Sequence, residues 1–185
     1  MPRSTQQKSG SAARSAVEPL ASGPLLALLA KYPLPSFLQG KCKPSLYYKW
    51  LKNKADTLLK RDKNRGKPYA LTATIAVYKG KIHDAVTIAG ERDPFTGETL
   101  AWELIDTWDT SHDQPDGYKR RFALMPTVDH VTADVLQFEI CSLKINDAKC
   151  DLTPAEFVDL CRQVVTYHGP RHARRGPAPR ARIPG

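Results

Sequence analysis

Two apolar runs followed by a strongly capped helix constrain the fold of this chain more than any other feature. Residues 122–128 are mostly apolar, which predicts a strand that ends at Asp129 and His130. Residues 135–145 predict a return strand, with a bulge where the apolar spacing is imperfect. The sequence Thr-Pro-Ala-Glu at 153–156 then predicts a helix start, because it combines a capping box with proline at the first helical position. The expected order is therefore strand, strand, helix.

Polar residues concentrate where these three elements meet. Asp129 and His130 end the first strand, and Asn146 and Lys149 precede the capped helix. A neutral histidine can take a proton near pH 7, and a carboxylate with an amide oxygen suits Mg²⁺, which keeps several of its waters. Neighbours on a regular strand point to opposite faces, so Asp129 and His130 converge only if the strand loses its regularity there. On the capped helix we expect a buried face, formed by Phe157, Leu160, Cys161 and Val164.

The pair Asp129-His130 followed by Asn-x-x-Lys at 146–149 resembles the HNH (His-Me finger) endonuclease motif, over residues 124–164. The resemblance implies an α+β fold with a ββα-metal core and a metal-dependent endonuclease that hydrolyses phosphodiester bonds in DNA. His130 would be the general base, and Asp129 and Asn146 would bind Mg²⁺ or Mn²⁺. Lys149 would be a further catalytic residue that positions the phosphate or braces the loop. Gln137 is the nearest match to the asparagine that braces the base-bearing loop in that family.

Cysteine spacing distinguishes this chain from HNH proteins that carry a zinc knuckle before the motif. The turn at 93–98 resembles such a lead-in without its cysteines, and we expect it to pack Trp102 and Ile105 against the core. The chain has four cysteines and none forms Cys-x-x-Cys, so we expect no structural zinc and predict buried free thiols. They are Cys42, Cys141, Cys150 and Cys161.

The residues before the turn predict an N-terminal helical extension. A short apolar helix is expected at 25–32, and a longer amphipathic helix at 45–62, where apolar residues recur every three or four positions. Residues 69–89 are ambiguous, since β-branching at 72–77 favours a strand. We favour a helix there because the apolar spacing is helical and Gly90 is a suitable stop, and we assign His83 a structural role.

The net charge of +9 is concentrated in one segment and two tails. Residues 41–67 hold ten basic residues against two acidic ones, and residues 170–185 hold five arginines and no acid. This distribution favours a polyanion partner, DNA or alternatively RNA, although a solvated basic helix face would look similar. The residues expected to bind the phosphate backbone are Lys49, Lys52, Lys60, Arg61, Lys63, Arg65, Arg120 and Arg121.

These patterns divide the chain into four expected regions: a disordered basic arm at 1–22, a helical basic region at 23–92, an HNH-like domain at 93–168 and a disordered Arg/Pro-rich tail at 169–185. No apolar run reaches the roughly 18 residues of a membrane span, and the N-terminus lacks the apolar segment of a secretory signal, so we expect a cytoplasmic protein. Two alternatives to a nuclease stay open. One is a non-catalytic nucleic-acid-binding module with the same fold, and the other is a protein-interaction domain with basic tails.

Overall fold

Helix α2 (Pro44–Asn64) is the longest element of the fold, and the helix predicted at 45–62 is confirmed. The computed structural model describes residues 23–105, 107 and 117–172. The arm at 1–22 and residues 173–185 of the tail, both predicted to be disordered, lie outside this range. The other helices and strands are α1 (Gly23–Lys31), α3 (Pro68–Thr72), α4 (Ile75–Ala89), α5 (Tyr118–Arg121), β1 (Pro126–His130), β2 (Phe138–Ser142), α6 (Leu143–Lys149) and α7 (Pro154–His172).

The ambiguous segment at 69–89 is helical, as the apolar spacing predicts, but it is divided into α3 and α4. Thr74 separates the two helices, because its side chain accepts a hydrogen bond from the Val77 N–H and so caps α4. Gly90 ends α4 with φ +67°, a conformation that glycine adopts without a steric penalty. His83 accepts or donates a hydrogen bond at 2.8 Å with the Tyr47 hydroxyl, which fits the structural role predicted for it.

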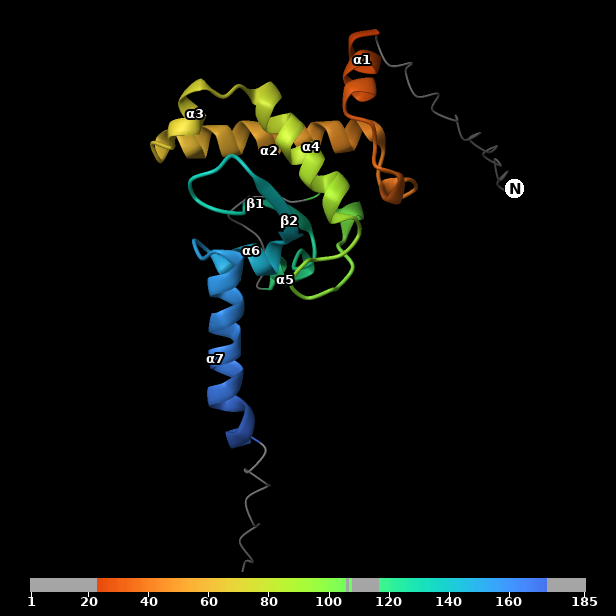
Figure 1. Cartoon of the computed structure of the whole chain (residues 1–185). Coiled ribbons are helices and arrows are strands. Elements are labelled where there is room, and N and C mark those ends of the chain that lie inside the picture. Colours follow the sequence, from red (N-terminus) through yellow and green to blue (C-terminus); the bar gives the residue numbers. More distant parts are fainter. Residues whose placement is uncertain (1–22, 106, 108–116, 173–185) are drawn as a thin grey trace, which may run out of the picture.

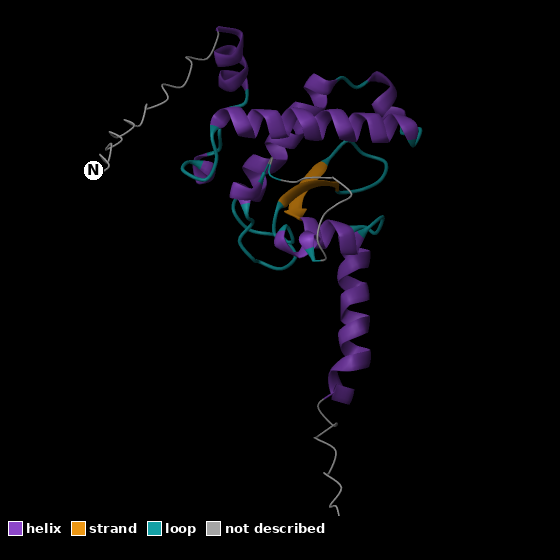
Figure 2. Ribbon diagram, turned by 180° about the vertical axis from the view of Figure 1, so that it is seen from behind, coloured by secondary structure: helices purple, strands orange, loops and turns teal. Residues whose placement is uncertain are grey.

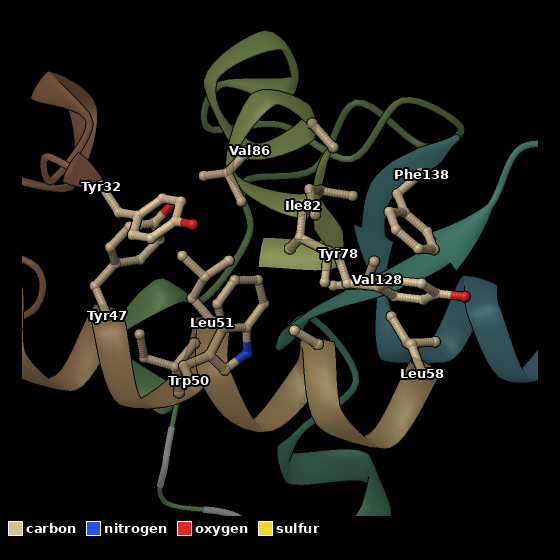
Figure 3. Packing of buried hydrophobic residues seen from close by; sticks show 14 of the residues in the cluster. Tyr32, Tyr47, Trp50, Leu51, Leu58, Tyr78, Ile82, Val86, Val128 and Phe138 are labelled. Carbon is tan, nitrogen blue, oxygen red and sulfur yellow. The ribbon is translucent and has the colours of Figure 1, made fainter. Parts of the chain in front are cut away.

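Strands β1 and β2 form a two-stranded antiparallel sheet, which gives the protein an α+β architecture. In Figures 1 and 2, α2 and α4 cross on one side of this sheet, and α6 lies on the other. Val128 and Phe138 face the α2–α4 side and belong to the main core, shown in Figure 3 with Leu58 and Tyr78 around them. Cys141 belongs to a smaller cluster on the α6 side, with Ile145 and Phe157.

A single core joins the two regions that the sequence analysis places on either side of residue 92. The ring centroids of Trp50 and Trp102 lie 5.6 Å apart, and those of Tyr78 and Phe138 lie 5.5 Å apart. Trp102 and Ile105 are buried, as predicted from the turn that precedes them. The helical region and the strand region therefore share buried side chains.

Both predicted strands are shorter than expected. Residues 122–125 form a turn after α5, held by hydrogen bonds from Ala123 N–H to Arg120 and from Met125 N–H to Phe122. A short apolar run does not distinguish a strand from a buried turn, and Phe122 is buried in this turn. After Ser142 the chain enters α6, whose first N–H groups, on Leu143 and Lys144, donate to backbone carbonyls of Met125 and Ala123. Asn146 and Lys149 are thus helical, and the return strand predicted over 135–145 ends at Ser142.

Helix α7 begins with the predicted capping box, in which Thr153 and Glu156 exchange hydrogen bonds. The buried face predicted for this helix is wrong beyond its first turn. Phe157 is buried, but Leu160, Cys161 and Val164 are exposed, because α7 extends away from the rest of the described chain (Figures 1 and 2). Residues 169–172, predicted to be disordered, continue this helix. Cys150 is exposed as well, so the prediction of buried thiols holds for Cys141 alone, with Cys42 half-buried.

The side chain of Asp93 stabilises the turn at 93–98, which resembles a zinc-knuckle lead-in without its cysteines. One carboxylate oxygen accepts the N–H groups of Phe95 and Thr96, both at 2.9 Å, and the other accepts the Ser142 N–H at 2.7 Å. The side chain is buried and links the turn to the end of β2. Burial raises the pKa of Asp93, but these N–H donors outweigh it and hold the pKa below its ordinary value.

We expect Asp93→Asn to lower the free energy of unfolding by about 2–3 kcal/mol, because the new amide group turns a donor toward the Ser142 N–H or loses its turn contacts. Since the folded-state pKa of Asp93 is depressed, its stabilisation is present above the unfolded-state pKa and is lost as pH falls through the folded-state value. The difference between wild type and variant in urea unfolding should therefore be full at pH 7 and shrink below about pH 4. The exposed Asp84→Asn serves as the control. A difference that is constant with pH would contradict the assignment.

In the part of the chain that the structure describes, no helix has the length and apolar character needed to cross a bilayer.

Candidate active site

A pocket of about 680 Å³ opens where β1 ends, between the C-terminal end of α2 and the turn from α6 to α7. Helix α2 and the residues after it contribute a basic and aromatic wall, and β1, its following loop and α6 contribute the opposite wall. The residues that matter below are Arg61, Asp62, Arg65, Lys67, Tyr69, Asp129, His130, Asn146 and Lys149. Arg65 and Asp151 form an ion pair at 3.6 Å that joins the two walls.

Asp129 and His130 lie on opposite faces of β1, as expected for neighbours on a regular strand. His130 contacts Asp62 on α2, whereas Asp129 contacts Lys149 on α6. Both residues nevertheless line the pocket, because the pocket lies at the end of the sheet where its two faces meet. Loss of strand regularity is therefore not what brings the two side chains to one site. The His130 N–H also donates to the Asp129 carboxylate at 2.8 Å, which fixes the short carboxylate against the strand end.

The His130 ring has a defined partner at each nitrogen. Its Nε2 lies 2.9 Å from Oδ2 of Asp62, and its Nδ1 lies 3.1 Å from Nη2 of Arg61. A guanidinium group only donates, so Nδ1 accepts in a neutral ring and the single proton is on Nε2, facing the carboxylate. The ring also packs edge-on against Phe138, with centroids 4.9 Å apart. Tautomer and orientation of His130 are thus set by α2 and β2.

Burial is the largest influence on the pKa of His130 and lowers it. The Asp62 carboxylate acts in the opposite direction and Arg61 reinforces the lowering, so that the pKa lies below its ordinary value. The ring is therefore neutral at pH 7, with a lone pair on Nδ1. A neutral imidazole with a free lone pair can accept a proton once Arg61 leaves that nitrogen.

Lys149 and Asp129 form a buried ion pair between α6 and β1. The Lys149 ammonium lies 2.9 Å from Oδ2 of Asp129, and only 2% of the lysine is exposed. The ammonium also donates to the Leu152 carbonyl at 2.6 Å, which fastens the turn from α6 to α7. This contact supports the bracing role, which is one of the two roles considered for Lys149.

The chemistry of the donor set fits a hard divalent cation. Oδ2 of Asp129 is buried and has no hydrogen bond with suitable geometry, although Lys149 balances its charge. Asn146 lines the same pocket, and no hydrogen bond of its side chain is present among the described residues. No group of three or more His, Cys, Asp or Glu residues in the described ranges could hold a metal ion. Mg²⁺ needs only one or two protein oxygen ligands, which a carboxylate and an amide supply.

Gln137 lies in the loop between the strands, where its exposed side chain has no hydrogen bond among the described residues. Its backbone carbonyl accepts the Val131 N–H at 3.1 Å, just beyond His130. Position 137 therefore contacts the residue that follows His130, but through its backbone carbonyl. The side-chain amide, which the sequence analysis chose by likeness to asparagine, does not make this contact.

The predicted phosphate-binding residues separate into three groups. Arg61 and Arg65 line the pocket, while Lys49, Lys52, Lys60 and Lys63 are exposed along α2. Arg120 and Arg121 are exposed on α5 and do not contribute to the pocket. Lys67 and Tyr69 belong to the pocket wall although the sequence analysis does not select them.

Asp62 is a further site residue that sequence analysis missed. It is 1% exposed on a helix that is otherwise basic and amphipathic, and Tyr78 donates to its Oδ2 at 2.7 Å. One signal was present in the sequence: Asp62 falls at helical spacing from Leu58 and Leu59, on or beside the apolar stripe, where an unpaired carboxylate would be costly. Its partner His130 is 68 positions away, so no local pattern identifies the pair.

Comparison of the chain with protein-family models, with curated proteins and with solved structures gives no match.

Proposed function

We propose that this protein is a metal-dependent endonuclease that hydrolyses phosphodiester bonds, with the pocket at the end of β1 as its active site and a ββα-metal core formed by β1, β2 and α6. One observation carries the proposal. A neutral histidine with a fixed tautomer lines the same pocket as a carboxylate, an uncommitted amide and two arginines, Arg61 of α2 and Arg65 directly after it. A general base, oxygen ligands for a cation and cationic groups for a phosphate are the components that this hydrolysis requires.

His130 acts as the general base through Nδ1. In the free protein the Arg61 guanidinium lies against this atom, so the base becomes available only when the guanidinium moves. A phosphate group is a stronger acceptor for a guanidinium than a neutral imidazole, because the hydrogen bonds are charge-assisted and can be bidentate. Substrate binding thus exposes the lone pair that takes a proton from the attacking water.

Asp129 and Asn146 would hold the divalent cation, Mg²⁺ or Mn²⁺. When bound, such an ion neutralises charge on the scissile phosphate and on the leaving oxygen. Lys149 pairs with Asp129 and holds the turn from α6 to α7 that lines the pocket. These residues bind and orient, while His130 moves the proton.

The expected substrate is DNA, with RNA as the other polyanion that this chemistry accommodates. Lys60 and Lys63 continue the basic character of the pocket wall along the exposed side of α2, and Arg65 follows directly after the helix. Such residues position a phosphate backbone without reading its sequence. Lys67 and Tyr69 extend the wall beyond the end of α2, where the flat ring of Tyr69 could stack on a base.

The test is cleavage of supercoiled plasmid by purified protein in EDTA, in Mg²⁺ and in Mn²⁺, with a single-stranded RNA in parallel. We expect nicking of the plasmid with either metal and none in EDTA, with activity restored when Mg²⁺ is added in excess. Cleavage that persists in EDTA would contradict the metal assignment. An absence of cleavage of either nucleic acid under every condition would contradict the nuclease proposal.

The second candidate is a nucleic-acid-binding module without catalysis. The observation in its favour is that Asp129 is neutralised internally by Lys149 and both His130 nitrogens have protein partners. Such a module would bind DNA with a steep dependence on salt, because phosphate contacts release counterions. Steep salt dependence without cleavage in the plasmid assay would therefore favour this candidate.

A further inference from the structure

We infer that Asp62 is the positioning residue of the general base: its carboxylate holds the Nε2–H of His130 and so keeps Nδ1 directed into the pocket. The inference rests on the proposed function and extends it to a helix outside the motif that suggested that function. Asp62 touches neither the pocket's cation ligands nor, by this proposal, the substrate. It acts through His130.

The geometry around Asp62 restricts the imidazole strongly. Oδ2 accepts from His130 Nε2 at 2.9 Å and from the Tyr78 hydroxyl at 2.7 Å, so two donors converge on one oxygen. Tyr78 comes from α4, and its ring packs against Phe138, which also packs against His130. The carboxylate is therefore held between two helices that share the main core, and it does not depend on the loop after β1 for its position.

The chemistry gives this contact a role beyond packing. An imidazole that accepts a proton at Nδ1 becomes a cation with both nitrogens protonated. The second N–H already faces a buried carboxylate, so the charge formed in the reaction meets an opposite charge that needs no rearrangement. Without Asp62 the ring could rotate or change tautomer, and Nδ1 would no longer be the basic nitrogen in the pocket.

A purely structural role for Asp62 makes a different prediction. A buried carboxylate requires donors, and in a purely structural role His130 and Tyr78 only satisfy Asp62. In that case a variant loses activity only to the extent that it loses folded protein. The positioning role instead predicts a slower reaction in fully folded protein with saturating DNA.

The experiment compares Asp62→Asn with Tyr78→Phe and Asp93→Asn in the full chain. Asp62→Asn keeps the shape and one acceptor and removes the charge, and Tyr78→Phe removes the other hydrogen bond to Asp62. Asp93→Asn alters another buried carboxylate, which contacts Ser142 at the end of β2 opposite to Phe138, the residue paired with His130. At a temperature where all are folded, we expect Asp62→Asn to lower kcat on the order of 10²-fold with KM changed by less than about threefold. Tyr78→Phe should lower kcat less, and Asp93→Asn should lower the Tm without a comparable loss in kcat.

Nuclear magnetic resonance of the imidazole nitrogens supplies a readout that needs neither metal nor DNA. In wild type, the His130 signal, identified by its loss in His130→Gln, should show the Nε2–H tautomer with a downfield proton that exchanges slowly. Asp62→Asn should move that proton upfield. A ring protonated on Nδ1, or a proton unaffected by Asp62→Asn, would overturn the inference.

The two readouts separate failure of this inference from failure of the proposed function. An active wild type with an equally active Asp62→Asn overturns the positioning role and leaves the nuclease intact. A wild type that shows the expected tautomer but cleaves nothing overturns the nuclease, and with it any catalytic meaning of the Asp62 contact.

Discussion

Replacing His130 with alanine should abolish metal-dependent DNA cleavage while leaving the affinity for DNA nearly unchanged. The imidazole is the only group in the described part of the pocket whose neutral form combines a lone pair with a fixed orientation. Loss of a general base reduces rates by about 10²–10⁴-fold. The residues proposed to bind the phosphate backbone do not include His130, so binding should persist. Nicking assays and fluorescence anisotropy on the same DNA measure the two quantities.

A matched control is needed because His130→Ala also removes buried contacts. Asp62 and Arg61 each lose a partner, which should lower the free energy of unfolding by about 1–3 kcal/mol. His83→Ala provides the control, since His83 also makes one hydrogen bond from a partly buried ring, to Tyr47. It should lose comparable stability and keep its cleavage rate below the unfolding transition. Substantial cleavage by His130→Ala would remove the general base from His130.

Local patterns in the sequence were sufficient for most of the helices. The stripe at 45–62 and the spacing at 69–89 predict α2 and α4, because an amphipathic helix needs only its own residues to be recognised. The capping box at Thr153 and the stop at Gly90 are equally local and are confirmed. These features fix where elements begin and end without reference to the rest of the fold.

The errors arise where distant residues decide the outcome. Helix α6 begins directly after β2 because carbonyls of Ala123 and Met125 accept its first N–H groups, which nothing near Ser142 reveals. Leu160 and Val164 have helical spacing, yet no element covers them, and spacing alone does not show whether a partner is present. Burial therefore depended on tertiary contacts that the periodic pattern does not contain.

In the candidate site, too, local sequence patterns identified some residues and missed those placed by distant contacts. Asp129, His130, Asn146 and Lys149 were selected from one short stretch, and the structure brings all four to one pocket. The contact that orients His130 comes from α2, a helix that charge alone marked only as a surface for phosphate. The basic helix thus has two sides with different roles: exposed lysines along one, and Arg61 and Asp62 at the pocket on the other. The sequence therefore indicates candidate reacting residues more readily than the distant residues that orient them.

The pair of Asp129 and Lys149 provides the second large effect, since stability and catalysis should respond to it in opposite ways. Asp129→Ala leaves the Lys149 ammonium buried without its carboxylate, and breaking a buried ion pair from one side costs about 3–5 kcal/mol. Removing both charges in Asp129→Asn with Lys149→Met should recover much of that loss, because the two neutral side chains fill similar space. Urea unfolding at pH 7 measures the recovery.

Cleavage should not recover with stability in that double variant. If Asp129 is a cation ligand, its amide replacement binds Mg²⁺ weakly, and removal of the competing ammonium does not restore the missing negative charge. We therefore expect the double variant to be folded, to bind DNA, and to cleave at least about 10²-fold more slowly than wild type at a fixed Mg²⁺ concentration. A decrease of this size corresponds to losing several kcal/mol of charge stabilisation in the transition state. Lys149→Met alone separates the partners: it retains Asp129, so higher Mg²⁺ should restore part of its activity. A double variant that cleaves like wild type would show that Asp129 serves only to balance Lys149, and the cation would then need ligands other than this carboxylate.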